Sequence, residues 1–207
     1  RTHFAWRQPE QLDFQGMLWH HAALIQDPAL KAFLTNILLD AKIMHPFYMA
    51  RASQDFHHNE KGGLFTHSVQ VALAAIEIAK NYGLEQPEVD CVFVCGLLHD
   101  IGKIMMFYNT DKNQQKVVNG QHEAFSFMVL AEHLERLKAQ DKALFEAVSA
   151  TLSINVNGKK HYEHVIETIV RAADRVSAEA YQSRAAFKGK PASRLRASFQ
   201  PGKHYKR

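Results

Sequence analysis

The chain has 207 residues, of which 46% are hydrophobic and 22% are charged. This length supports one domain with a sizeable core, and the composition is typical of a globular protein rather than a disordered one. No apolar run is long enough to cross a membrane, and the first residues do not form a signal-peptide pattern, so we expect no membrane partner. The only cysteines, Cys91 and Cys95, stand four residues apart in an apolar helical stretch, where a disulfide would distort the helix. We therefore expect two buried thiols and a cytoplasmic location.

The net charge of +4 hides an asymmetry between the two ends of the chain. No acidic residue follows Glu179, whereas eight basic residues do, which leaves about −4 for the first 179 residues. The simplest interpretation of this end is a solvated basic tail. The alternative is an arm that contacts nucleic-acid phosphates and stacks on bases through Phe187, Phe199 and Tyr205. The candidate nucleic-acid-binding residues are Arg184, Lys188, Lys190, Arg194 and Arg196.

Apolar residues recur every three or four positions along most of the chain, and this spacing predicts helices. The expected helices span 13–26, 28–44, 66–82, 87–99, 122–139, 141–153 and 162–181. Pro46 should break the second helix, and Gly83 should end the third. The polar segments 51–63 and 109–120 predict loops. No stretch alternates with a period of two for long enough to form a sheet, so the fold class is expected to be an all-α bundle with a basic C-terminal extension.

Polar side chains interrupt the apolar stripes of three predicted helices. His67 shares a stripe with Val71, His99 and Asp100 end an apolar run, and Asp174 follows apolar residues of the last helix. A lone core histidine usually has a hydrogen-bond partner, and a buried carboxylate is costly unless it is paired. Four such groups that point inward from three helices favour a bound cation. Two imidazoles and two carboxylates suit one or two divalent ions such as Mn²⁺, Fe²⁺, Mg²⁺ or Zn²⁺.

Three sequence motifs resemble those of the HD superfamily of metal-dependent phosphohydrolases. They are GGLFTHSVQVA (62–72), GLLHDIGKI (96–104) and IVRAADRVS (169–177). The resemblance covers roughly residues 45–181 and implies a helical bundle that holds a divalent metal. The ligands that it implies are His67, His99, Asp100 and Asp174. The resemblance also divides the chain into three parts: N-terminal helices (1–45) that pack on the core, the HD metal-site domain (46–181) and the basic tail (182–207).

The same resemblance implies that metal-activated water attacks a phosphorus centre, with Asp100 and Lys103 as the catalytic residues. A divalent ion lowers the pKa of bound water and neutralises charge on phosphate oxygens. Lys103 lies one turn after the His99–Asp100 pair and is expected to approach a phosphate, with a solvated lysine as the alternative. Neighbouring residues on a helix point about 100° apart. We therefore expect Gly102 to let the chain turn so that His99 and Asp100 converge.

The segment SQDFHHNEKGGLFTHSVQVALAA, residues 53–75, is similar to the start of the HD module of MobH-type conjugative relaxases, the TraI family. Those proteins carry a histidine cluster just before the GGL motif. His57 and His58 match two of its positions, whereas Phe56 stands at a third. The resemblance implies that the chain processes DNA as the relaxase module of a conjugative transfer protein. It also implies DNA and proteins of the conjugation machinery as partners.

His122 and Glu123, at the start of a predicted helix, also resemble the relaxase pattern. A second metal or a phosphate contact is therefore a hypothesis for His57, His58 and His122, with ordinary surface histidines as the alternative. YhaM-type 3′–5′ exoribonucleases share the His-His before Gly-Gly-Leu, but they carry a His-His-Gly where this chain has SINVNG (153–158). A nucleotide phosphohydrolase, such an exoribonuclease and a non-catalytic HD binding module remain the alternative functions.

Overall fold

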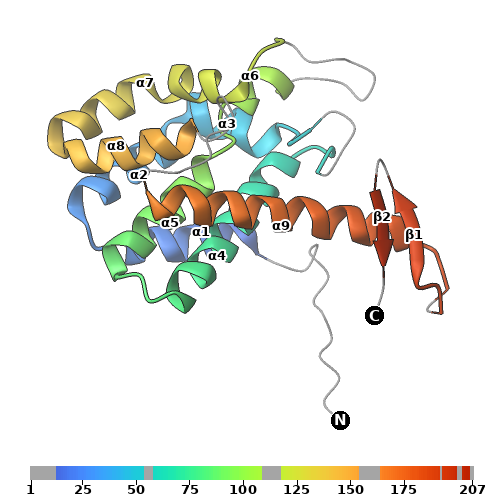
Figure 1. Cartoon of the computed structure of the whole chain (residues 1–207). Coiled ribbons are helices and arrows are strands. Elements are labelled where there is room, and N and C mark those ends of the chain that lie inside the picture. Colours follow the sequence, from blue (N-terminus) through green and yellow to red (C-terminus); the bar gives the residue numbers. More distant parts are fainter. Residues whose placement is uncertain are drawn as a thin grey trace.

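The computed structural model describes residues 13–53, 58–108, 118–153, 164–191, 193–199 and 202–205. The described chain is all-α apart from a short C-terminal hairpin, as the helical periodicity predicts (Figure 1). The helices are α1 (Phe14–Leu24), α2 (Pro28–Leu39), α3 (Ala41–Met49), α4 (Gly63–Asn81), α5 (Gln86–Leu98), α6 (Lys103–Phe107), α7 (His122–Gln140), α8 (Lys142–Leu152) and α9 (Val165–Phe187). Among the described residues, none of these helices is both long and apolar enough to cross a bilayer.

Aspartate side chains set several helix boundaries. Asp40 ends α2 and begins α3, where its carboxylate accepts a hydrogen bond from the backbone N–H of Lys42. This is a typical N-cap interaction, and it divides the apolar segment that the sequence predicted as one helix over 28–44. Pro46 lies inside α3, so the prediction that it breaks the helix is wrong. Gly83, with φ of 74°, follows the end of α4, which confirms its expected role as a stop.

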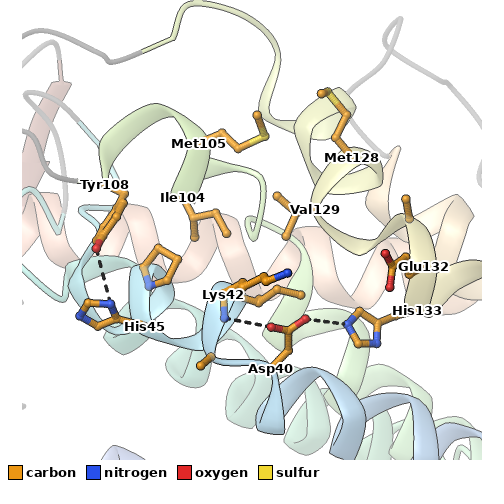
Figure 2. Close-up of a pocket in the computed structure, with 14 residues that line it drawn as sticks. Asp40, Lys42, His45, Ile104, Met105, Tyr108, Met128, Val129, Glu132 and His133 are labelled. Atoms are coloured by element: carbon orange, nitrogen blue, oxygen red, sulfur yellow. Dashed lines mark hydrogen bonds and ion pairs between the residues drawn. The ribbon is translucent and has the colours of Figure 1, made fainter.

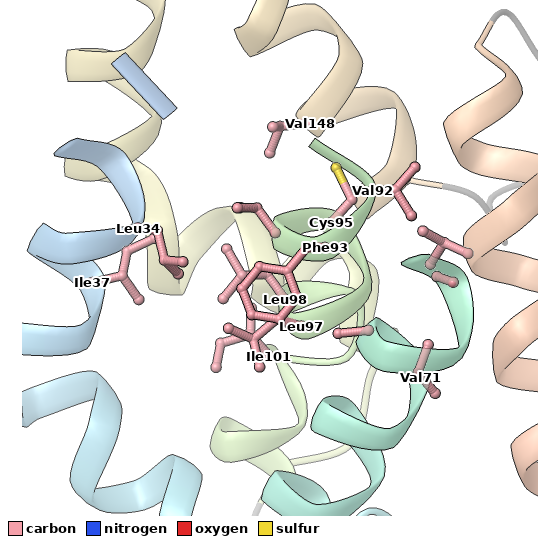
Figure 3. Close-up of a cluster of buried hydrophobic side chains, with 14 of the residues drawn as sticks. Leu34, Ile37, Val71, Val92, Phe93, Cys95, Leu97, Leu98, Ile101 and Val148 are labelled. Carbon is pink, nitrogen blue, oxygen red and sulfur yellow. The ribbon is translucent and has the colours of Figure 1, made fainter. Parts of the chain in front are cut away.

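Helix α5 forms the centre of the molecule. All of its residues from Val89 to Leu98 are buried. Figure 3 shows five of them among side chains of neighbouring helices: Val92, Phe93, Cys95, Leu97 and Leu98. Its partners in the core include Leu34 and Ile37 of α2, Val71 of α4 and Val148 of α8. Because α5 is apolar all round, its sequence could not indicate which face meets which neighbour.

A glycine sets the closest helix contact in the core. A Cβ at Gly96 of α5 would lie 2.9 Å from Ala72 Cα and 3.3 Å from Ala72 N of α4. Only a residue without a side chain fits this approach, because these contacts are with backbone rather than with a flexible side chain. The separation of α4 and α5, and with it the distance between His67 and His99, therefore depends on Gly96.

The C-terminal part differs from the expected tail. Helix α9 continues to Phe187 rather than ending near 181, and it leads into an antiparallel hairpin of β1 (Arg196–Phe199) and β2 (Gly202–Tyr205). In this register Arg196 pairs with Tyr205, and the hairpin packs at the end of α9 (Figure 1). The prediction that this end has no regular structure is wrong for the two strands. Each strand has only four residues, which is too short for a period-two pattern to stand out.

Replacing Gly96 with alanine should lower the free energy of unfolding by about 1–3 kcal/mol, because α4 and α5 must separate to admit the methyl group. Urea denaturation measures this loss. Glu77→Ala, on the exposed face of α4, is the control and should change stability by less than about 0.5 kcal/mol. Equal stability of Gly96→Ala and the native chain would contradict the close helix contact.

Candidate metal centre

The first two candidate ligands face each other across the α4–α5 contact. His67 of α4 is fully buried, and its ring centroid lies 5.2 Å from that of His99 at the end of α5. The Nδ1 atom of His99 lies 2.7 Å from the carbonyl oxygen of Gly96. Since a carbonyl can only accept, Nδ1 carries the hydrogen, which leaves Nε2 directed at the neighbouring carboxylates.

Asp100 reaches the same point because the chain turns tightly after α5. Successive backbone hydrogen bonds link Ile101 to Leu98 and Lys103 to Asp100, each spanning three residues. Gly102 has ordinary helical dihedral angles (φ −61°, ψ −18°), so the expectation that its conformational freedom makes this turn is wrong. A Cβ at Gly102 would instead lie 2.0 Å from the carbonyl oxygen of His122, so this glycine admits the first turn of α7.

Asp174 comes from the long helix α9, and its side chain is 37% exposed. Ser177 follows it by three residues and therefore lies on the same face. The Oγ atom of Ser177 is 3.2 Å from His67 Nδ1, within hydrogen-bond distance. The sequence analysis did not identify Ser177, although its spacing from Asp174 in the third motif was a usable signal. This contact orients the His67 ring so that Nε2 faces the carboxylates.

The four candidate ligands meet at one place. His67 Nε2 lies 3.4 Å from Asp100 Oδ2 and 3.1 Å from Asp174 Oδ1. His99 Nε2 lies 3.4 Å and 3.7 Å from the same two oxygens. Ligand atoms about 2.1 Å from one ion lie about 3.0 Å apart at right angles and about 3.4 Å apart at tetrahedral angles. The separations of Asp100 Oδ2 from the two imidazoles therefore fit donors around a single divalent ion, and Asp174 Oδ1 lies within 3.7 Å of the same two imidazoles. His67, His99 and Asp100 alone already form a group that could hold a metal.

Positive and hydrogen-bonding groups keep both carboxylates of the cluster ionised. Burial by itself would raise the pKa of Asp100, but the charges of Lys103 and His99 hold it well below its usual range. Burial would likewise raise the pKa of Asp174, but hydrogen bonding to His67 and His99 lowers it. Burial disfavours protonation of His99, yet the nearby charges of Asp100 and Asp174 raise its pKa to about 10. Two ionised carboxylates thus retain their charge in a largely buried site only because positive groups surround them.

Lys103 contacts the cluster directly. Its Nζ atom lies 2.6 Å from Asp100 Oδ2, and its side chain is 16% exposed. Charge-assisted bonds of this length are strong, so Lys103 holds the Asp100 carboxylate in place. The solvated lysine considered from the sequence is therefore excluded, and the phosphate contact stays a prediction.

His122 binds the other oxygen of Asp100. Its Nε2 lies 3.0 Å from Asp100 Oδ1, and its Nδ1 lies 3.3 Å from Oε2 of Glu123, a carboxylate that is only 4% exposed. Ser126 supports this turn because its Oγ accepts from Gly102 N and donates to the His122 carbonyl. A chain of carboxylate, imidazole and carboxylate is a common way to orient a metal ligand. His122 thus binds the carboxylate of Asp100, which is itself one of the four candidate ligands.

His58 packs against His67 and Tyr181. It is 4% exposed, with its ring centroid 5.4 Å from His67 and 5.0 Å from Tyr181 of α9. A Cβ at Gly63 would lie 2.2 Å from the His58 carbonyl oxygen, so the second glycine of the GG motif allows this approach. The surface-histidine alternative does not apply to His58. His57 lies outside the described residues.

The candidate nucleic-acid-binding residues lie beyond the metal cluster. All five are exposed, from the last turns of α9 to the start of β1: Arg184, Lys188, Lys190, Arg194 and Arg196. Arg184 stands ten residues after Asp174 on α9, or about 15 Å along the helix axis. The structure therefore brings together the residues of the three motifs, whereas the basic residues form a separate surface.

Space beside the ligands is limited. A cavity of about 20 Å³ is lined by His99, His122, Glu123, Thr151, Leu152, Val170, Arg171 and Asp174. This volume is sufficient for one water molecule. Among the four candidate ligands, Asp174 has by far the most exposed side chain. In the described part of the chain, the α9 side is therefore the open side of the cluster.

Comparison with protein families supplies the class of the domain. Residues 34–144 match the model of the HDOD domain, which is more than half of the chain. The chain belongs to the HDOD family, and this confirms the expected HD-like domain. The match contains His67, His99 and Asp100, whereas Asp174 and the hairpin lie after it. The similarity to MobH-type relaxases stays a prediction. No curated protein and no solved structure matched the chain.

Replacing His122 with alanine should weaken divalent-metal binding by about 10–100-fold without abolishing it, because the carboxylate of Asp100 loses one orienting partner. Competition with a chromophoric chelator measures the affinity. His20→Ala, an exposed histidine of α1, is the matched control and should leave the affinity unchanged. An unchanged affinity in His122→Ala would show that the contact with Asp100 does not support a metal site.

Proposed function

We propose that the chain is a metal-dependent phosphohydrolase that cleaves phosphodiester bonds of nucleic acid. The observation that carries the proposal is that His67, His99 and Asp100 form a group that could hold a divalent ion, with Asp174 beside both imidazoles. Such an ion would supply an activated water and neutralise charge on a phosphate. An all-nitrogen-and-oxygen donor set suits Mn²⁺, Fe²⁺, Mg²⁺ or Zn²⁺.

The residues around the cluster have separate tasks in this proposal. Lys103 and His122 hold the two oxygens of Asp100, and Ser177 orients His67. Lys103 is partly exposed and carries the positive charge that a substrate phosphate would meet first. Asp174 borders the open side, so the substrate approaches along α9.

A nucleic-acid substrate is supported by the exposed basic residues farther along the same helix. The exposed basic residues begin about 15 Å along α9 from Asp174. Stacked nucleotides advance about 3.4 Å each, so a strand of roughly five nucleotides reaches from the cluster to Arg184. A free nucleotide is too short to contact both the metal cluster and Arg184. The cavity at His99 is small for a nucleotide, so we expect the bulk of the substrate to lie outside the bundle.

Within this class we favour DNA processing as the relaxase module of a conjugative transfer protein, because residues 53–75 resemble that family's module. Proteins of the conjugation machinery are then the expected protein partners. The alternatives are a nucleotide phosphohydrolase, a YhaM-like exoribonuclease and a non-catalytic HD binding module.

Cleavage of labelled single-stranded oligonucleotides tests the proposal. We expect the native chain with added Mn²⁺ to cleave a 12-nucleotide DNA, and Asp174→Asn to lower the rate at least about 100-fold by removing one ligand charge. Asp141→Asn, a helix-capping aspartate of α8, is the matched control and should retain the activity. Denaturing gels separate the products.

Other substrates distinguish the alternatives. Cleavage of RNA alone would support the exoribonuclease, and phosphate release from nucleotides alone would support the nucleotide hydrolase. Oligonucleotide binding without cleavage, with each of Mn²⁺, Fe²⁺, Mg²⁺ and Zn²⁺, would support the binding module and contradict catalysis.

Replacing Arg184, Lys188 and Lys190 with glutamine should weaken strand binding and lower its salt dependence. The same change at Lys80, Arg136 and Lys142 controls for net charge.

A further inference from the structure

A second, much larger cavity lies apart from the ligand cluster. It has a volume of about 700 Å³ and is formed by the α2–α3 corner, α6 and α7. Figure 2 shows Tyr108 and His45 at one end and Glu132 and His133 at the other. Small-molecule sites usually have volumes of roughly 300–1,000 Å³, so this groove is large enough for a ligand of drug or nucleotide size.

The walls of the groove are held in place without a ligand. Asp40 at the α2–α3 corner accepts from the backbone N–H of Lys42, and its other oxygen lies 3.4 Å from His133 Nε2 on α7. His133 is only 8% exposed, so this pair links the two sides of the groove at a buried position. At the opposite end, Tyr108 Oη lies 3.5 Å from His45 Nδ1. A preformed site loses little conformational freedom on binding.

The middle of the groove is apolar and rich in soft side chains. Ile104, Met105, Met128 and Val129 lie between the two polar ends in Figure 2. Met128 is 63% exposed, so its side chain is accessible to a ligand in the groove. Methionine sulfur contacts aromatic rings favourably and adapts to their shape, so this surface suits a flat ring system.

Lys42 gives the groove its charge preference. Asp40 is engaged by His133 and by backbone, and Glu132 pairs with Arg136 at a distance of 3.8 Å. Within the described part of the chain, the Lys42 ammonium makes no ion pair. Lys42 is exposed at the groove, where its ammonium is available to pair with one negative group on an otherwise apolar ligand.

We propose that this groove is a binding site for a small aromatic anion, whose rings lie on Met105, Met128 and Val129 and whose acidic group pairs with Lys42. The site does not depend on the metal cluster, although α6 contributes to both: Lys103 contacts Asp100, and the next two residues line the groove. Nothing in the proposed phosphodiester cleavage uses these residues.

Two related fluorescent probes test the assignment. 8-Anilinonaphthalene-1-sulfonate is an aromatic anion, and N-phenyl-1-naphthylamine is its neutral parent. We expect one equivalent of each to bind the full chain. Lys42→Met should weaken binding of the sulfonate about fivefold and leave the neutral probe within about twofold, since only the sulfonate pairs with the ammonium. Lys80→Met, an exposed lysine of α4, is the matched control and should change neither affinity.

Val129→Trp should block both probes by filling the groove, with thermal unfolding used to verify that the variant is folded. The proposal is overturned if neither probe binds at one site, or if Lys42→Met affects both probes equally. It is also overturned if a folded Val129→Trp binds both probes as tightly as the native chain. These readouts require no metal and no hydrolysis, so they are independent of the proposed catalytic function.

Discussion

The candidate metal centre depends on one close contact between two helices. Because Gly96 has no side chain, α5 approaches the backbone of α4 at Ala72, and this sets His67 beside His99. A second glycine, Gly102, admits the first turn of α7 in the same way, which sets His122 against Asp100. The geometry of the cluster therefore follows from helix packing rather than from flexible loops. Sites built on packed helices hold their donors closely, as metal binding requires.

The same contact also determines which charged groups lie close together in the cluster. Together with α9, it brings the carboxylates of Asp100 and Asp174 within 4 Å of two imidazoles, with Asp100 buried and Asp174 37% exposed. Lys103 and His99 supply positive charge beside the two carboxylates. Burial disfavours protonation of His99, but the neighbouring carboxylates raise its pKa to about 10. A divalent ion would satisfy both carboxylates at once and use both imidazoles as neutral ligands. Membership of the HDOD family and the donor distances thus support the same interpretation.

The sequence predicted the inward direction of the candidate ligands better than it predicted their surroundings. His67, His99, Asp100 and Asp174 each interrupt an apolar stripe, so their inward direction was readable from spacing. The turn between α2 and α3 at Asp40 could not be predicted from spacing. The residues on both sides of it are equally apolar, and only the capping interaction marks the break. The role of Gly102 was also misjudged: its backbone is ordinary, and the constraint comes from α7, which is distant in sequence. Such tertiary contacts leave no local pattern.

The most direct test of the account is the metal content of the purified protein, measured by elemental analysis beside a folded Asp100→Ala variant. The account predicts one or two equivalents of a divalent transition metal in the native chain and its loss in the variant, which removes the carboxylate shared by His67, His99 and Lys103. No metal in the native chain after reconstitution with Mn²⁺ or Fe²⁺, or equal content in the two proteins, would contradict it.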